Sequence, residues 1–304
     1  MRLRIATRRS RLALWQAEHV KARLEALHAG LVTELLPLST RGDELLEVRL
    51  DKVGGKGLFV RELEGALQDG RADLAVHSMK DVPAQLPPDF LLAAILERED
   101  ARDAFVSNSH AALDALAQGA RVGTSSLRRA AQVAERHPGL QLRMLRGNVE
   151  TRLAKLDRGE YDAILLAAAG LKRLGLGGRI RSLLSLEESL PAPGQAALGV
   201  ECMAGKSEVL RLIAPLQHAA SASCVRAERA VSLALGGSCT IPLGAYAELA
   251  GGQLRLRALV AAPDGRRVAR VDCTGAAADP EALGTRAAAE LRARGADEIL
   301  AAIG

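Results

Sequence analysis

Residues 72–83 read ADLAVHSMKDVP, and this stretch decides the fold that the sequence predicts. It begins with an apolar run, Leu74 to Val76, that is typical of a buried parallel strand. The run changes at once into polar residues, and Pro83 stops any regular continuation. Because ligands in an open α/β sheet bind outside the carboxyl ends of the strands, Lys80 and Asp81 stand where chemistry is usually done. By itself, the stretch is also typical of a strand followed by a simple polar turn.

The composition indicates an ordinary soluble globular protein of two or three domains. The chain has 304 residues, more than one domain usually contains, with 48% hydrophobic and 25% charged residues. Aromatic residues make up only 2%, so the core must consist of Leu, Ala, Val and Ile. No apolar run is long enough to span a membrane, and the N-terminus lacks the apolar region of a secretory signal. We therefore expect a cytoplasmic protein without a membrane partner.

The cysteines and the net charge exclude some classes of site. The cysteines at positions 202, 224, 239 and 273 form no CxxC pair, which is neither a zinc pattern nor a disulfide framework. We expect no metal site and mostly buried, inert thiols. The formal net charge of +5 permits nucleic-acid binding but also suits a polyanionic small molecule. Because aromatic residues are scarce, stacking platforms for single-stranded nucleic acid are largely missing, which disfavours that partner.

The first hundred residues predict alternating strands and helices. Before the opening stretch, we expect strands at 3–6 and 31–38 and helices at 12–28 and 58–67. One face of the first helix should be formed by Leu12, Trp15, His19 or Val20, Leu24 and Leu27.

A highly charged segment, residues 41–57, separates the second strand from the second helix and ends in GGKG. Its simple interpretation is a flexible surface loop, and its functional interpretation is a mobile lid that carries Lys52 and Lys56. It is not a Walker loop, because a Gly-Lys-Ser/Thr at the required spacing is missing.

The chain repeats itself in weak but ordered similarities. IATRRS at 5–10 is similar to VGTSSL at 122–127, and GRADLAV at 70–76 is similar to GEYDAIL at 159–165. Both pairs keep the same order, which strengthens the comparison. We infer two related α/β lobes, and a cleft between lobes is a preferred ligand site.

Basic residues near helix starts in the second lobe point to an anion. The run Thr124-Ser125-Ser126 leads into a helix that carries Arg128 and Arg129, and small hydroxyl residues at a helix start expose N–H groups that suit an anion. Asn148 is a plausible N-cap, with Arg152 following in the first turn. An Arg early in a helix opposes the macrodipole unless an anion lies nearby. Arg173 again follows the end of a strand.

The last third of the sequence predicts a small α+β domain. PAPGQ at 191–195 indicates a crossing between lobes, and 215–218 indicates a second boundary. The elements expected beyond it are a helix at 221–235, strands at 241–249, 254–261 and 268–273, a helix at 280–294 and a final short helix. Cys239 falls in an exposed turn after Gly236 and Gly237, although a buried structural thiol is the usual interpretation of such a residue.

Long and specific motifs now identify a resemblance. They are IATRRS (5–10), LALWQ (12–16), TRGD (40–43), VGGKGLF (53–59), AVHSMKDVP (75–83), GTSSLRR (123–129), RGNVETRL (146–153), LPAPGQ (190–195) and GGSC (236–239). With them, nearly the whole chain resembles the porphobilinogen deaminases, also called hydroxymethylbilane synthases.

This resemblance implies a fold and a reaction. It implies two lobes like those of type II periplasmic binding proteins, joined by two hinge strands, with a small C-terminal α+β domain. The expected domains are 1–96 plus 197–214, 101–191, and 218–304. The implied activity is that of a transferase of tetrapyrrole (haem) biosynthesis. It joins four porphobilinogen molecules head to tail, releases ammonia, and passes linear hydroxymethylbilane to the next enzyme; we expect a monomer.

The resemblance also implies the site residues. Cys239 would hold a dipyrromethane cofactor through a thioether, and Asp81 matches the family's catalytic aspartate. Residues implied to bind the cofactor, besides Asp81, are Lys80, Thr124, Ser126, Arg128, Arg129 and Arg146. Residues implied to bind the substrate are Arg8, Ser10, Lys52, Lys56, Phe59, Ser125, Asn148, Arg152, Arg173 and Gln195. Paired guanidinium forks suit the acetate and propionate groups that each pyrrole carries.

The sequence departs from the family pattern at a few positions. Ala196 stands where a second Gly is common, Arg11 where a smaller or apolar residue is common, and Ser221 where Thr is common.

Two rival functions fit the sequence less well. A periplasmic anion-binding module would need a secretion signal and no reactive Cys or Asp. Nucleic-acid binding is disfavoured because aromatic residues are scarce. We expect His77 to be a packed or hydrogen-bonding residue rather than a metal ligand.

Overall fold

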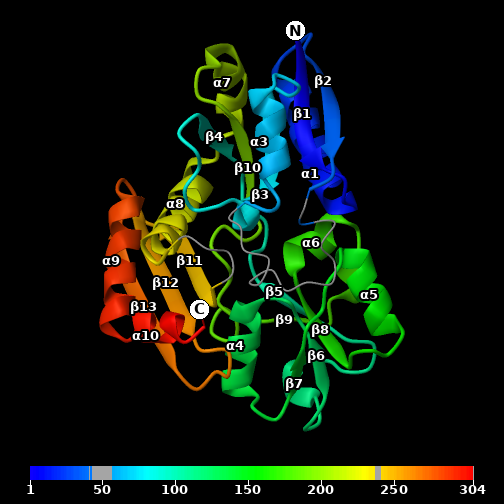
Figure 1. Ribbon diagram of the computed structural model, residues 1–304, viewed down its shortest axis with the longest axis vertical. Helices are drawn as coiled ribbons and strands as arrows, with labels where there is room; N and C mark the ends of the chain where they lie inside the picture. The colour runs from blue at the N-terminus through cyan, green and yellow to red at the C-terminus, as the bar shows by residue number, and fades with distance from the viewer. Residues whose placement is uncertain (41, 43–56, 237–240, 304) are drawn as a thin grey trace. The chain divides into compact units, whose positions relative to one another are not determined.

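The computed structural model describes residues 1–40, 42, 57–236 and 241–303 (Figure 1). The chain divides into two compact units, each of which contains two segments of the sequence. The first unit is Met1–Glu99 with Ala196–Ser223, and the second is Asp100–Gln195 with Cys224–Gly304. One unit boundary falls directly after the predicted crossing at 191–195. A second falls within helix α8 (Ala219–Ala234), beyond the predicted 215–218, and a third lies between Glu99 and Asp100.

The first unit is built on one mixed five-stranded sheet with the order β2-β1-β3-β10-β4. β1 runs parallel to β2 and β3, whereas β10 runs antiparallel to β3 and β4. The strands are β1 (Arg2–Arg8), β2 (Val32–Leu38), β3 (Leu74–Ser78), β4 (Phe90–Ile95) and β10 (Leu198–Met203). The helices are α1 (Arg11–Leu27), α3 (Arg61–Gln68) and α7 (Ser207–Ile213).

The second unit contains a sheet of the same design, with the order β7-β6-β8-β5-β9. Here β6 is parallel to β7 and β8, and β5 is antiparallel to β8 and β9. The strands are β5 (Asp103–Val106), β6 (Arg121–Gly123), β7 (Gln141–Arg143), β8 (Ala163–Ala167) and β9 (Ser182–Leu183). The helices are α4 (Leu127–Arg136), α5 (Val149–Asp157) and α6 (Ala168–Arg173). The predicted repeat of two α/β lobes is therefore confirmed.

The repeated Gly-x-x-Asp motif makes equivalent hydrogen bonds in both sheets. Asp73 accepts a hydrogen bond from the backbone N–H of Arg4 at 2.7 Å, and Asp162 accepts one from Arg121 at 2.7 Å. In each lobe the arginine side chain also donates to the carbonyl of the motif's glycine, which has a positive φ. The motif thus ties the start of one central strand to its parallel neighbour.

Helices cover both faces of each sheet because the central strands alternate their side chains. In β1, Leu3 and Ile5 pack with α1 and α7, whereas Ala6 packs with α3 on the other face. In β8, Ile164 packs with α5 and α6, whereas Leu165 packs with α4. Both strands are buried on both faces, as the apolar run at the opening stretch predicts for β3.

The third sheet is the predicted small α+β structure. It is an antiparallel meander, β11 (Leu243–Ala250), β12 (Gln253–Ala261) and β13 (Val268–Ala276), with α9 (Pro280–Ala293) and α10 (Ala296–Ala301) beside it in Figure 1. Residues of α8, α9 and α10 share its core, whereas Leu259 and Ala261 of β12 pack with Ala131 of α4. This sheet and the second lobe belong to one compact unit, so the division into three domains stays a prediction.

Some local predictions are wrong in detail. The predicted face of α1 is right at Val20 and Leu24, which are buried. It is wrong toward the start of the helix, where Ala13 and Ala17 are buried instead. Trp15 is instead 37% exposed and stacks on His19 with ring centroids 5.3 Å apart. A turn at 57–60 precedes α3, so that helix starts later than predicted. In the described ranges, no helix is long and apolar enough to cross a membrane.

The crossing at 191–195 is held within the second unit by backbone and side-chain contacts. The N–H of Gly194 donates to the buried carboxylate of Glu228 at 2.7 Å, and the Gln195 amide donates to the carbonyl of Ala101 at 2.6 Å. Directly beyond it, Ala196 has a φ of +71°, and it is the only non-glycine residue with a positive φ in the described part of the chain. That left-handed conformation favours Gly, the residue that the resemblance leads us to expect at this position.

Two helical glycines give a matched test of the packing. A Cβ at Gly284 of α9 would lie 2.3 Å from the carbonyl oxygen of Ala227, whereas Gly65 of α3 has open space. We predict that Gly284→Ala lowers the stability of the protein by about 1–3 kcal/mol through overpacking. Gly65→Ala should raise it by up to about 1 kcal/mol through helix propensity. Calorimetric melting temperatures measure both effects, and a Gly284→Ala variant that melts at or above the wild-type temperature contradicts the packing described here.

Candidate active site

The opening stretch forms β3 followed by a short 3-10 turn, η1 (Met79–Asp81). The N–H of Met79 donates to the carbonyl of Ala197 at 3.0 Å, and its side chain is buried. Gly199 leaves room for it, because a Cβ there would lie 2.3 Å from the Met79 sulfur. Met79 therefore anchors the turn, and the half-buried Lys80 and Asp81 follow it at the carboxyl end of β3.

A buried contact between a histidine and a carboxylate supports the same strand. His77 Nε2 lies 2.8 Å from Glu201 Oε2 on the neighbouring strand β10, and both side chains are almost completely buried. Burial raises the pKa of the nearby Glu64 carboxyl, and the Glu201 charge raises it further. His77 is a packed, buried residue, which is one of the two roles predicted for it. Glu201 was not predicted, because nothing in its local sequence sets it apart from a surface carboxylate.

The structure describes three other predicted site residues of the first unit, which are Arg8, Ser10 and Phe59. Arg8 ends β1, and its guanidinium carbon lies 4.3 Å from the centre of the Phe59 ring, which is cation–π distance. Ser10 caps α1 by accepting from the N–H of Ala13 at 3.3 Å. Gly42 lies against the Phe59 ring, and its N–H donates to the carbonyl of Leu58 at 3.0 Å. Lys52, Lys56 and most of the lid at 41–57 lie outside the described residues.

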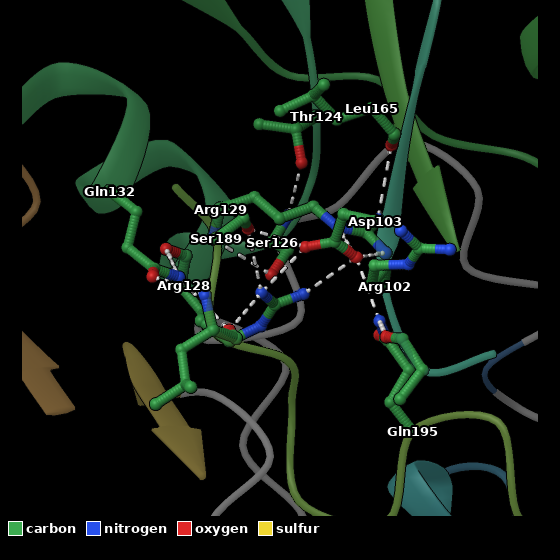
Figure 2. A network of polar contacts seen from close by, with 12 residues as sticks. Arg102, Asp103, Thr124, Ser126, Arg128, Arg129, Gln132, Leu165, Ser189 and Gln195 are labelled. Carbon is green, nitrogen blue, oxygen red and sulfur yellow. Dashed lines mark hydrogen bonds and ion pairs between the residues drawn. The ribbon is translucent and has the colours of Figure 1, made fainter. Parts of the chain in front are cut away.

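In the second unit, two predicted arginines converge on one carboxylate that was not predicted (Figure 2). Arg128 Nη1 and Nη2 donate to Oδ2 and Oδ1 of Asp103 at 2.8 and 3.2 Å. Arg129 Nε and Nη2 both donate to Asp103 Oδ1, at 3.0 and 2.7 Å. All three side chains are buried, and no other carboxylate bonds either arginine within the described ranges. Asp103 is the anion that relieves the conflict of these arginines with the α4 dipole.

Further side chains complete this network. The Ser189 hydroxyl donates to Asp103 Oδ2 at 2.7 Å, and the Gln195 amide donates to Oδ1 at 2.9 Å. Arg128 also donates to the carbonyl of Leu190 at 2.6 Å, and Arg129 donates to that of Leu165 at 3.1 Å. The network therefore joins α4 to three separate backbone segments of the unit.

Burial alone would raise the pKa of Asp103, but the charges of Arg128 and Arg129 outweigh burial and hold that pKa well below its usual range. Both guanidinium groups remain charged, so one carboxylate faces two positive charges. Arg128 Nε is buried and has no hydrogen-bond partner among the residues that the structure describes. A buried, unpaired donor beside excess positive charge is a favourable environment for a second anion.

The hydroxyl residues before α4 act as caps. Ser126 is the N-cap and accepts from the N–H of Arg129 at 3.4 Å, and Thr124 accepts from the N–H of Ser126 at 3.1 Å. Ser125 lies between them and is half-buried. Two of the N–H groups expected to meet an anion are therefore already paired within the protein.

The remaining predicted residues of this unit lie at other helix ends. Asn148 is the N-cap of α5, as predicted, and accepts from the N–H of Thr151 at 2.8 Å. Arg152 Nε donates to the carbonyl of Gly147 at 2.8 Å, and the half-buried Arg146 precedes that glycine. Arg173 is the last residue of α6. Cys239 lies outside the described residues; of the other cysteines, Cys202 and Cys224 are buried and Cys273 is half-buried.

Comparison with known proteins identifies the family. The family model described as "Porphobilinogen deaminase, dipyromethane cofactor binding domain" matches residues 3–211, and "Porphobilinogen deaminase, C-terminal domain" matches residues 222–293. The porphobilinogen deaminase of Bordetella parapertussis is 60% identical over 300 residues, covering 99% of this chain and 96% of that protein. That of Thiobacillus denitrificans is 59% identical over 301 residues, covering 99% and 98%.

Among solved structures, the methionine binding protein MetQ covers 71% of this chain and 89% of its own, with a TM-score of 0.46 and 13% identity. The two family models together match far more than half of the sequence, and both relatives match it almost from end to end. This chain belongs to the porphobilinogen deaminase family.

Proposed function

We propose that this chain is a transferase that joins four porphobilinogen molecules head to tail, with release of ammonia, to give hydroxymethylbilane. The observation that carries the proposal is the match of residues 3–211 and 222–293 to the two domains of this family. The charged turn after β3 supports it, because Lys80 and Asp81 lie at the strand end where α/β sheets bind ligands.

The described residues suit the proposed dipyrromethane cofactor, which bears two acetate and two propionate groups. The two guanidinium groups around Asp103 carry one more positive charge than that carboxylate neutralises. Arg128 Nε is also a buried donor without a partner in the described ranges. We assign cofactor binding to Lys80, Asp81, Thr124, Ser126, Arg128, Arg129 and Arg146, and covalent attachment to Cys239. When bound, the cofactor supplies the pyrrole carbon to which the first substrate is joined.

We assign substrate binding to basic and polar side chains, which would bind the carboxylates of porphobilinogen. Guanidinium groups bind carboxylates through two parallel hydrogen bonds, and each porphobilinogen brings two carboxylates. The Asn148 oxygen is used as a helix cap, so its amide N–H₂ is the part that would meet substrate. The full assigned set is Arg8, Ser10, Lys52, Lys56, Phe59, Ser125, Asn148, Arg152, Arg173 and Gln195.

Asp81 is assigned to the chemical step. Loss of ammonia from porphobilinogen leaves a cation spread over the pyrrole ring, and a fixed carboxylate stabilises that charge as it develops. The same carboxylate accepts hydrogen bonds from pyrrole N–H groups and takes up the proton that leaves on coupling. The buried anchor at Met79 limits the movement of Asp81, which reduces the cost of reorganisation during the reaction.

A monomeric state, delivery of the product to the next tetrapyrrole enzyme and a division into three domains rest on the family resemblance. A cytoplasmic location rests on the sequence pattern of the N-terminus.

We predict that the intact wild-type protein is heavier than its sequence by the mass of a dipyrromethane. Cys239→Ser should lack this increment, because a hydroxyl does not replace the thiolate nucleophile under the same conditions. Cys273→Ser, which changes a half-buried thiol of β13, is the matched control and should keep the increment. Mass spectrometry of the intact proteins measures this, and an active wild-type enzyme without added mass rules out the covalent cofactor.

We predict that Asp81→Asn keeps the added mass but lowers kcat by a factor of about 100 or more, because the neutral amide neither balances the cation nor accepts the proton. Asp89→Asn is the control, since Asp89 is an exposed carboxylate of the same unit, and it should turn over at the wild-type rate. Steady-state kinetics with porphobilinogen separate kcat from KM. A near-normal kcat for Asp81→Asn would remove Asp81 from the chemical step.

A further inference from the structure

We propose that Asp103 is a positioning residue for cofactor assembly, which holds Arg128 and Arg129 as one pre-formed pair for the carboxylates of the pyrrole chain. This inference rests on the proposed function, in which those two arginines bind the cofactor. Asp103 is buried at the start of β5, and the local sequence EREDARDAFV gives it no distinction from the neighbouring charged residues.

Asp103 binds the two guanidinium groups in different ways (Figure 2). It binds the Nη1–Nη2 edge of Arg128 with both of its oxygens, and it binds the Nε–Nη2 edge of Arg129 with Oδ1 alone. Different edges are therefore occupied, and the two guanidinium planes are fixed relative to the same carboxylate. The Nε of Arg128 belongs to the edge that Asp103 leaves unused, and it lacks a partner in the described part of the chain.

Asp103 is itself held in place by hydrogen bonds. Ser189 donates to Oδ2 and Gln195 donates to Oδ1, so four side chains in all determine the orientation of this carboxylate. A binding residue that is held by a second layer of hydrogen bonds loses little conformational freedom when its ligand arrives. This arrangement is what a pre-formed anion site requires.

Asp103 balances part of the charge of the two arginines. Two buried guanidinium groups without a counter-charge would repel each other and pay a large desolvation cost. Asp103 supplies one negative charge, enough to keep the pair in the folded protein before any ligand is present, and leaves one positive charge for an incoming carboxylate. A purely structural ion pair would also hold α4 on β5. The experiment therefore separates an effect on cofactor binding from an effect on the stability of the folded protein.

The experiment measures cofactor loading for each folded chain. Wild type, Asp103→Asn, Ser189→Ala and Asp162→Asn are produced without a supply of porphobilinogen and then incubated with porphobilinogen well below their melting temperatures. The gain of the dipyrromethane mass is followed with time and divided by the folded fraction. Asp162→Asn is the matched control, because it breaks an arginine–carboxylate pair of the same unit outside the network.

We expect Asp162→Asn to load at the wild-type rate. Ser189→Ala keeps the Asp103 charge but removes one of its hydrogen bonds and one from Arg128, so loading should slow by about tenfold. Asp103→Asn should load at least about 100-fold more slowly, because its amide N–H₂ faces guanidinium donors. After loading, Ser189→Ala should show a kcat within about twofold of wild type, since the chemical step at Asp81 is unchanged.

Loading at the wild-type rate by folded Asp103→Asn overturns the proposal and leaves Asp103 a structural residue. If Asp103→Asn does not fold, Ser189→Ala decides, and its loading at the wild-type rate overturns the proposal as well. Failure of the proposed function looks different, because the wild-type protein would then gain no mass from porphobilinogen.

Discussion

One buried carboxylate facing two buried arginines is the constraint on which the second unit depends. Asp103 lies on β5, Arg128 and Arg129 lie on α4, and their partners Ser189 and Gln195 come from the segment that leads to the first unit. Breaking such a pair leaves an uncompensated buried charge, which costs about 3–5 kcal/mol. The same groups that orient the proposed anion site therefore also determine how the helix sits on its sheet.

The first unit holds its charged turn in place by different contacts. Its charged turn is anchored by an apolar residue, Met79, which fills the space left by Gly199, and by the His77–Glu201 pair between two strands. The two lobes share strand order and the Asp73 and Asp162 clamps, but they differ in the chemistry at their strand ends. A repeated scaffold thus carries Lys80 and Asp81 after β3 in one unit and the paired Arg128 and Arg129 on α4 in the other.

Sequence reasoning predicted what depends on local pattern. The buried run of β3, the cap Asn148, the C-terminal meander and the order of the repeat follow from periodicity and turn residues. Asp103 and Glu201 were missed because their partners are distant in sequence and because each resembles a solvated carboxylate locally. The face of α1 was misjudged because Trp15 was given more weight than the small residues Ala13 and Ala17, which lie against the sheet.

The position of Asp103 has a consequence in acid. Its pKa is lowered in the folded protein, whereas an aspartate of the unfolded chain titrates near 4. Its stabilising effect is therefore complete at neutral pH and is lost progressively as the pH falls below about 4 toward the folded-state value. Arg128 and Arg129 keep their charges over this range, so protonation of one oxygen leaves two like charges in the core. Acid should thus loosen the α4–β5 junction and, with it, the second unit.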